Sequence, residues 1–143
     1  MKADTITESD VKAVLDRAAE GYAKRDLSIF RAVFAPDPDV VMYGTGFDEK
    51  RIGLTEIQAQ IERDWSQTEA AVMTYGWMSV SVVGSVAWVA ADADFNFRVG
   101  GQEMTLPARI TFVLEKREKQ WLIVHVHISF PAAGQSEGES FPK

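Results

Sequence analysis

Two glycine-centred turns in the second half of the chain constrain its fold more than any other feature. Gly84-Ser85 and Gly100-Gly101 each separate two long stretches rich in β-branched and aromatic residues. Two-residue loops of this composition are typical of tight β-hairpins, in which the loop fixes the register of both strands. Together with the alternation of apolar residues, the turns predict antiparallel strands at about residues 71–83, 86–98, 103–116 and 121–130.

The predicted register brings together three side chains that can take part in binding or catalysis. Counting back from the second turn places Asp92 opposite Arg109, and counting back from the first places Trp77 opposite Asp92. Directly opposite residues of antiparallel strands point to the same side of the sheet. We therefore expect a carboxylate, a guanidinium and an indole to share one face.

The second predicted strand has two different faces. One face is wholly apolar and consists of Ala87, Val89, Ala91, Ala93, Phe95 and Phe97. The other face mixes apolar and polar residues, namely Trp88, Ala90, Asp92, Asp94, Asn96 and Arg98. Burial of both faces would account for this composition, with helices on one side and a second subunit or further helix on the other.

The overall composition indicates one soluble globular domain. The chain has 143 residues, of which 46% are hydrophobic and 25% charged, so it can bury a core without disulfides. No apolar run reaches the roughly 20 residues of a membrane span, and the first residues are too polar for a signal sequence. The lack of cysteine excludes thiolate metal sites and favours a cytoplasmic location. A net charge of -6 argues against a nucleic-acid partner, and nothing indicates a membrane partner.

Helical spacing predicts three helices in the first half of the chain. A variant capping box at Thr7 and Asp10 begins the first, whose apolar residues recur at helical spacing until about Lys24. Asp26 can cap a short second helix, which two prolines end after residue 35. A further capping box at Thr55 begins the third. Helices followed by an antiparallel meander indicate an α+β domain.

Two shorter segments complete the predicted organisation. Residues 40–43 predict a short strand, which a glycine-rich turn follows. Residues 132–143 are polar and lack apolar periodicity, which predicts a disordered C-terminal tail. The remaining chain, residues 1–131, is expected to form a single domain.

Two stretches carry a resemblance to a known family. The helical stretch Leu54–Trp65 ends in a tryptophan, and the stretches Ala108–Val113 and Trp121–Ser129 form a closing hairpin with an early arginine and late histidines. These resemble the SnoaL-like branch of the nuclear transport factor 2-like superfamily and the association domain of calcium/calmodulin-dependent protein kinase II. The resemblance implies a cone-shaped fold, with a strongly curved antiparallel sheet around about three helices, a pocket at the wide end, and dimers formed through the sheet.

The resemblance also assigns pocket positions. Arg109 and Trp65 match pocket-lining residues, and Phe30 and Ile57 match neighbouring wall positions. In the kinase association domain the positions of Ala90 and Ile128 are arginines. Here both are apolar, which leaves Arg109 as the single guanidinium of the expected pocket.

The Asp92–Arg109 pair has three interpretations, of which a purely structural ion pair is the most common in proteins. Arg109 could instead orient a small organic acid, because its planar fork suits a carboxylate. Asp92 could act as a general base with a raised pKa if it were partly desolvated. The choice among these interpretations stays open at this point.

His125 and His127 point to the same side of the last strand because strand side chains alternate. Two imidazoles at this spacing could hold a metal with an added carboxylate, yet we predict no metal site. The length of the turn after Lys116 decides whether they share the face of Arg109. The resemblance favours the register that places Ile128 in the pocket and both histidines outside it.

These observations predict a homodimeric, small-molecule-binding domain without a cofactor, with an organic acid as the expected type of ligand. Its apolar pocket is expected to be lined by Trp65, Trp77, Trp88, Tyr43, Ile128, Asp92 and Arg109. One alternative is an isomerase, cyclase or dehydratase that uses Asp92 as its base. The other alternative is a dimerisation module that has no ligand.

Overall fold

The alternating stretches fold into four long strands that form most of one sheet. In the computed structural model, which describes all 143 residues, both predicted turns are present. The strands are β3 (Ala70–Val83), β4 (Val86–Val99), β5 (Gln102–Arg117) and β6 (Gln120–Ser129). Gly84 and Gly100 adopt positive φ angles of 58° and 59°, as these tight turns require. The four strands therefore lie within two residues of their predicted positions.

Two short strands extend the sheet beyond β6. They are β1 (Val41–Tyr43) and β2 (Lys50–Ile52), and the strand order is β2-β1-β6-β5-β4-β3. β1 runs parallel to β6, so the expectation of an entirely antiparallel sheet is wrong. The parallel pair arises because the chain passes through helices and long strands between them, rather than through a hairpin. β2 was not predicted from the sequence.

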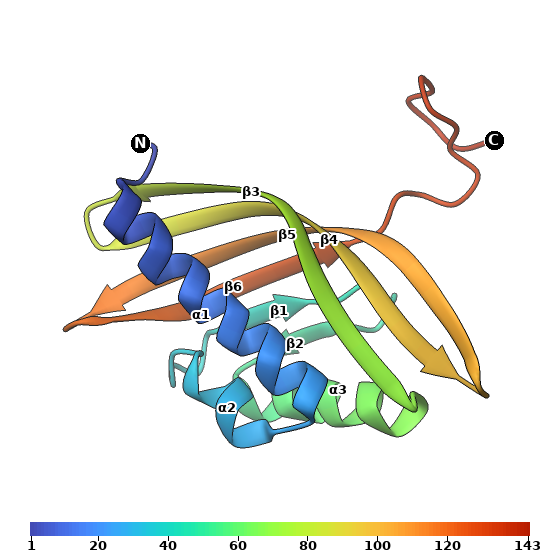
Figure 1. Cartoon of the computed structure of the whole chain (residues 1–143), viewed down its shortest axis with the longest axis horizontal. Helices are drawn as coiled ribbons and strands as arrows, with labels where there is room; N and C mark the ends of the chain where they lie inside the picture. The colour runs from blue at the N-terminus through green and yellow to red at the C-terminus, as the bar shows by residue number, and fades with distance from the viewer.

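Three helices lie on the concave side of the sheet, which arches over them (Figure 1). They are α1 (Thr5–Lys24), α2 (Leu27–Ala32) and α3 (Leu54–Gln67). Asp26 caps α2 as predicted, but the cap of α1 is Asp4, whose carboxylate accepts a hydrogen bond from the Thr7 amide. The predicted cap at Thr55 is also wrong, because α3 begins after Gly53 without a side-chain cap. The first error displaces the helix cap by three residues and the second by two.

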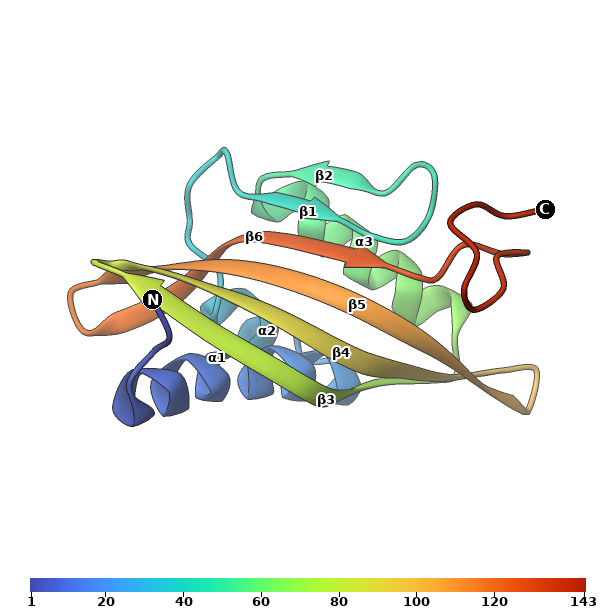
Figure 2. The same cartoon turned by 90° about the horizontal axis from the view of Figure 1, so that it is seen from above.

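Two β-bulges bend the long strands. In β3, Gly76 and Trp77 lie between the pairs Tyr75–Ala93 and Met78–Ala91, so two residues oppose Asp92. In β6, Val124 is the extra residue between the partners of Val113 and Leu114. A bulge increases the local twist and moves all later side chains of that strand to the opposite face. The curvature of the sheet is visible from above (Figure 2).

The hydrophobic core lies between α1 and the concave side of the sheet. The largest fully buried side chains are Leu15, Ile57, Ile110, Leu114, Ile123, Val11, Val40 and Val89. The apolar face of β4 points into this core, since Ala87, Val89 and Ala91 are all buried. The mixed face of β4 therefore forms part of the convex side.

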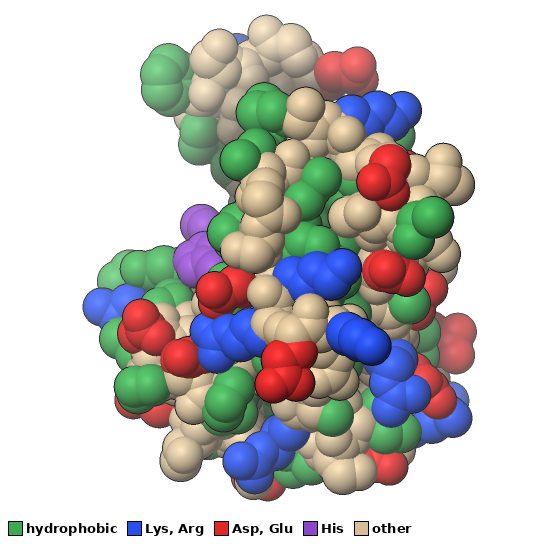
Figure 3. Space-filling view, turned by 90° about the vertical axis from the view of Figure 1, so that its left-hand side faces the viewer, with side chains coloured by type: hydrophobic (Ala, Val, Ile, Leu, Met, Phe, Trp, Pro, Cys, Tyr) green, Lys and Arg blue, Asp and Glu red, His purple; other side chains and the backbone are tan.

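The outer surface carries mixed charges. At the end of the molecule where α1 begins, acidic and basic side chains are interspersed (Figure 3). None of the helices combines the length and apolar character of a membrane span. Residues 132–143 contain turns but no helix or strand, and they extend away from the sheet (Figure 1). The proposed disorder of this tail and the domain boundary at residue 131 stay predictions.

Candidate functional site

The cluster predicted from the hairpin register forms, but it lies on the convex side of the sheet. Asp92 pairs with Arg109 as predicted, and the bulge places Trp77 opposite Asp92. Asp92 and Arg109 are both exposed, and 63% of the Trp77 surface is accessible to solvent. None of these three residues lines the cavity described below. Their predicted placement in a pocket is wrong, because the apolar face of β4 faces the helices and so turns Asp92 outward.

The structural interpretation of this pair also fails. No ion pair joins Asp92 and Arg109, although their backbones are register partners. The Arg109 guanidinium instead donates a hydrogen bond from Nη2 to the Phe130 carbonyl oxygen, at 3.2 Å. Asp92 and Arg109 are therefore two separate surface charges.

The bulge in β6 decides the positions of Ile128 and the histidines. A two-residue loop joins β5 to β6, since Arg117 pairs with Gln120. The extra residue Val124 then changes the register, so that His127 lies opposite Thr111 on the convex side. Ile128 lines the cavity and the histidines lie outside it, as predicted. Arg109, however, shares its face with the histidines and not with Ile128.

Three further predicted pocket residues lie outside the cavity. Tyr43 is exposed on the convex side, where its ring lies 5.2 Å from that of His127. Trp88 is half-buried on the same side, opposite Val113. Trp65 is close to the cavity but does not line it: its Nε1 donates to the Tyr22 carbonyl oxygen at 3.0 Å. No group of His, Asp and Glu side chains on either side of the sheet is arranged to hold a metal ion.

The cavity lies between the concave side of the sheet and the helices, and has a volume of about 280 Å³. Of its 24 lining residues, 17 are hydrophobic. Its aromatic walls consist of Tyr22, Phe30, Phe34, Tyr75, Phe95, Phe97, Phe112 and Phe130. Phe30 is thus a wall residue, as the resemblance implied. A cavity of this size and composition suits a small organic molecule.

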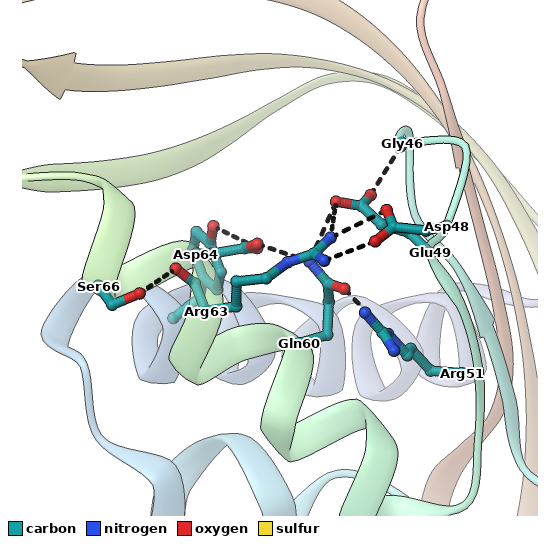
Figure 4. Close-up of polar contacts among 9 residues, drawn as sticks. Gly46, Asp48, Glu49, Arg51, Gln60, Arg63, Asp64 and Ser66 are labelled. Atoms are coloured by element: carbon teal, nitrogen blue, oxygen red, sulfur yellow. Dashed lines mark hydrogen bonds and ion pairs between the residues drawn. The ribbon is translucent and has the colours of Figure 1, made fainter.

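One end of the cavity is polar and centres on Asp64 of α3 (Figure 4). The Tyr22 hydroxyl donates to Asp64 Oδ2 at 3.0 Å, and Gln60 Nε2 donates to Asp64 Oδ1 at 2.8 Å. The same Gln60 nitrogen donates to Glu49 Oε1 at 3.1 Å. Gln60 is only 2% exposed and is the one polar residue in the buried set. One buried amide therefore holds two carboxylates at the edge of the cavity.

Two arginines support this polar end from outside the cavity lining. Arg63 forms ion pairs with Asp48 at 2.8 Å and with Glu49 at 3.0 Å (Figure 4). Arg51 Nε donates to Gln60 Oε1 at 3.0 Å, which fixes the orientation of the amide. These contacts tie the segment between β1 and β2 to α3.

The electrostatic environment disfavours the ionised forms of Asp64 and Tyr22. Burial raises the pKa of Asp64 above its ordinary value, and the charge of Glu49 adds to this. The hydrogen bonds from Gln60 and Tyr22 and the charge of Arg63 act in the opposite direction without cancelling the effect. Burial and the adjacent Asp64 charge raise the pKa of Tyr22 well above its usual range. Tyr22 is therefore a neutral hydrogen-bond donor.

Sequence reasoning missed Tyr22, Gln60 and Asp64 as site residues. Gln60 and Asp64 each follow by three positions an isoleucine of the apolar stripe of α3, so they lie beside that stripe. Polar residues at such positions are a signal that could have been used. Two of the wall residues, Phe95 and Phe97, belong to the apolar face of β4 and were visible in its alternation.

Comparisons with known proteins agree with this architecture. A family model described as the SnoaL-like domain matches residues 11–133. A search of the curated proteins found no match. Among solved structures, a nuclear transport factor 2-like superfamily protein from Salmonella enterica superimposes with a TM-score of 0.83 and 21% identity, over 97% of this chain and 100% of that one.

Two other solved structures carry more specific names. A Xanthomonas campestris protein, provisionally assigned as a calcium/calmodulin-dependent protein kinase II association domain, has a TM-score of 0.78 and 24% identity, over 92% of this chain and 95% of that one. A Streptomyces avermitilis protein of the same superfamily, provisionally assigned as a dehydratase, has a TM-score of 0.78 and 17% identity, over 87% and 96%. At these identities the likeness establishes the fold and not the activity.

Proposed function

The chain belongs to the SnoaL-like domain family, and we propose that it binds a small, largely apolar organic molecule in the cavity beneath its sheet. The observation that carries this proposal is the cavity of about 280 Å³, with 17 hydrophobic residues among its 24 lining residues. Burial of apolar ligand surface contributes roughly 2.5 kcal/mol per 100 Å². The polar end at Asp64 would orient the ligand.

The organic acid expected from Arg109 is not part of this proposal. Arg109 lies on the convex side, and no Lys, Arg or His lines the cavity. A carboxylate inside the cavity would therefore meet Glu49 and Asp64 without a compensating cation. The polar end favours a hydrogen-bond donor in that position.

A cavity-filling variant with a matched control tests the proposal. Ala19 lines the cavity and Ala13 is exposed on the same helix, so Ala19→Phe and Ala13→Phe make the same change in two environments. The probes are tryptophol, tryptamine and indolepropionate, which share an indole and end in an alcohol, an amine or a carboxylate. At least one should raise the melting temperature of the wild type and of Ala13→Phe, but not of Ala19→Phe. Equal responses in both variants would show that binding occurs outside the cavity.

Acid–base catalysis is a second candidate function, and Asp64 replaces Asp92 as its proposed base. Asp64 lines the cavity, has a raised pKa and contacts the Tyr22 hydroxyl, whereas Asp92 is exposed on the other side of the sheet. In such a reaction the carboxylate would take a proton from a carbon next to a ligand carbonyl. It would then return that proton to another atom of the same ligand, as an isomerisation requires.

Hydrogen–deuterium exchange can detect this proton transfer without knowledge of the natural ligand. β-Tetralone in deuterated buffer should exchange the protons next to its carbonyl faster with the wild type than without protein. Asp64→Asn should abolish the acceleration, and Asp92→Asn should retain it. Loss of acceleration in Asp92→Asn alone would contradict the role given to Asp64.

We also propose that the domain is a homodimer formed through the convex side of its sheet. The support is the exposure of large apolar residues there, with Trp77 at 63% and Val72 at 42%. Light scattering should give twice the chain mass for the wild type and a lower mass for Trp77→Ser. A module that only dimerises would show this result without the cavity-dependent binding described above. The cytoplasmic location stays a prediction.

A further inference from the structure

The charged side chains that line the cavity are all acidic. Glu49 and Asp64 are the only charged side chains among its 24 lining residues, and both are acidic. The nearby arginines, Arg51 and Arg63, contact the polar network but do not line the cavity. A ligand in the cavity therefore meets carboxylates at one end and no cationic side chain.

The two carboxylates differ in how their charge is balanced. Glu49 forms an ion pair with Arg63 at 3.0 Å and also accepts hydrogen bonds from the Gly46 amide and Gln60. Asp64 forms no ion pair and accepts hydrogen bonds only from the neutral side chains of Tyr22 and Gln60. A half-buried carboxylate without a cationic partner is unfavourable. A cation supplied by the ligand would offset this cost.

The aromatic walls extend from this carboxylate into the cavity. The Tyr22 ring, whose hydroxyl contacts Asp64, lies 5.8 Å from the Phe95 ring, which lies 5.7 Å from the Phe97 ring. Aromatic faces attract ammonium groups and also pack against apolar ligand atoms. The same surface can therefore hold both the charged end and the apolar body of one molecule.

From this arrangement we propose that the ligand is an organic amine with an aromatic or similarly apolar body, whose protonated nitrogen binds the Asp64 carboxylate. The inference rests on the proposed function, because it names the chemical class of the molecule that the cavity takes. A neutral ligand would leave the Asp64 charge without a partner, and an acid would add a third negative charge.

The three indole probes test the ligand charge directly. Isothermal titration at neutral pH should show that tryptamine binds the wild type at least about tenfold more tightly than tryptophol, as a charge-assisted hydrogen bond allows. Indolepropionate should bind most weakly. Asp64→Asn should remove the preference for tryptamine. It should change the affinity for tryptophol by no more than about twofold, which is well below the tenfold difference expected between the two probes. Asp92→Asn, which removes an exposed carboxylate from the convex side, should change none of these affinities.

The pH dependence of the wild type provides a test that does not depend on the folding of Asp64→Asn. The groups that face Asp64 are Tyr22 from α1, Gln60 and Arg63 from α3, and Glu49 from the segment between β1 and β2. Tryptamine binding should weaken as the pH falls and Asp64 becomes protonated, at a higher pH than for an ordinary aspartate. Tryptophol binding should change much less over the same range.

The outcomes separate the two proposals. If no probe binds in a way that Ala19→Phe prevents, the proposed function fails, and the ligand class fails with it. If binding depends on Ala19 but tryptophol or indolepropionate binds as tightly as tryptamine, only the amine inference is overturned. Retention of the tryptamine preference in Asp64→Asn would overturn it as well.

Discussion

The two sides of the sheet are built from alternate residues of the same strands, yet they differ in chemistry. On β4 the concave side presents Ala91, Ala93 and Phe95, and the convex side presents Trp88 and Asp92. The convex side has the more varied functional groups, but neither Trp88 nor Asp92 lines the apolar cavity. The concave side is mainly apolar and gains its polar groups from α1, α3 and the segment between β1 and β2. A shared face is therefore not sufficient for a binding site, because the helices decide which face becomes enclosed.

The largest expected effect comes from neighbouring residues of β5 that point to opposite sides. Ile110 is 2% exposed in the core, and Thr111 is exposed on the convex side. Ile110→Ala should lower the unfolding free energy by about 3 kcal/mol, because it leaves a cavity in the core. Thr111→Ala should change it by less than about 0.5 kcal/mol. Urea denaturation measures both, and similar losses would contradict the assignment of the two sides.

Tyr22 beside the cavity and Tyr43 on the convex side should also differ in their contributions to the unfolding free energy, though by a smaller amount. Tyr22→Phe removes the hydrogen bond to Asp64, which should cost about 1–2 kcal/mol. Because that bond lowers the pKa of Asp64, its loss should raise this pKa further. Tyr43→Phe on the convex side should have almost no effect. Denaturation and NMR titration of the Asp64 carboxyl group check the two expectations, and an unchanged titration in Tyr22→Phe would argue against the contact.

The pH dependence of stability tests the environment of Asp64. The pKa of folded Asp64 is raised above its ordinary value of 3.8, so the folded state binds more protons than the unfolded state between these two values. The Asp64 contribution to stability should therefore fall as the pH rises from below 3.8 through the raised pKa, and then stay constant. Melting temperatures should show Asp64→Asn gaining stability relative to the wild type across this window.

A control variant is needed here because Asp4, Glu8 and Asp26, among other carboxylates, have lowered pKa values and give the opposite trend. Taking the difference between variant and wild type removes their contribution. Asp92→Asn, which removes an exposed carboxylate from the convex side, serves as this control. A flat difference for Asp64→Asn would mean that Asp64 is not held in a desolvated environment.

The smallest expected effect on unfolding concerns Trp77. Because most of its surface is exposed, Trp77→Ser should change the unfolding free energy of the isolated chain by less than about 0.5 kcal/mol. If the convex side forms the dimer interface, the same change should shift the midpoint of dimer dissociation to higher protein concentration. Dilution experiments monitored by light scattering separate the two effects.

Local patterns predicted the strands well because each hairpin is determined by its own residues. The turn at Gly100 sets the register of β4 and β5 along their whole pairing, and the turn at Gly84 sets that of β3 and β4 as far as the bulge at Gly76 and Trp77. The pairing of Asp92 with Arg109 follows from this register. The family resemblance, which the SnoaL-like domain match confirms, supplied the curvature and the position of the helices.

The site could not be predicted in the same way because it depends on contacts between distant segments. Tyr22 and Asp64 are 42 positions apart, and only the packing of α1 against α3 brings their side chains together. The orientation of the strands relative to the helices is likewise a tertiary property. Without it, alternation separates two faces of β4 but does not say which of them is enclosed.

A single extra residue, Val124, determines which side of the sheet the neighbouring side chains of β6 face. With Val124 present, Ile128 faces the cavity and His127 faces outward beside Tyr43. Deletion of Val124 would reverse these orientations. The histidine side chains would then face the cavity, and the aliphatic side chains that now line it would face the convex side. A domain of this kind can thus acquire a chemically different chamber by a change of length, without any substitution among the residues that surround it.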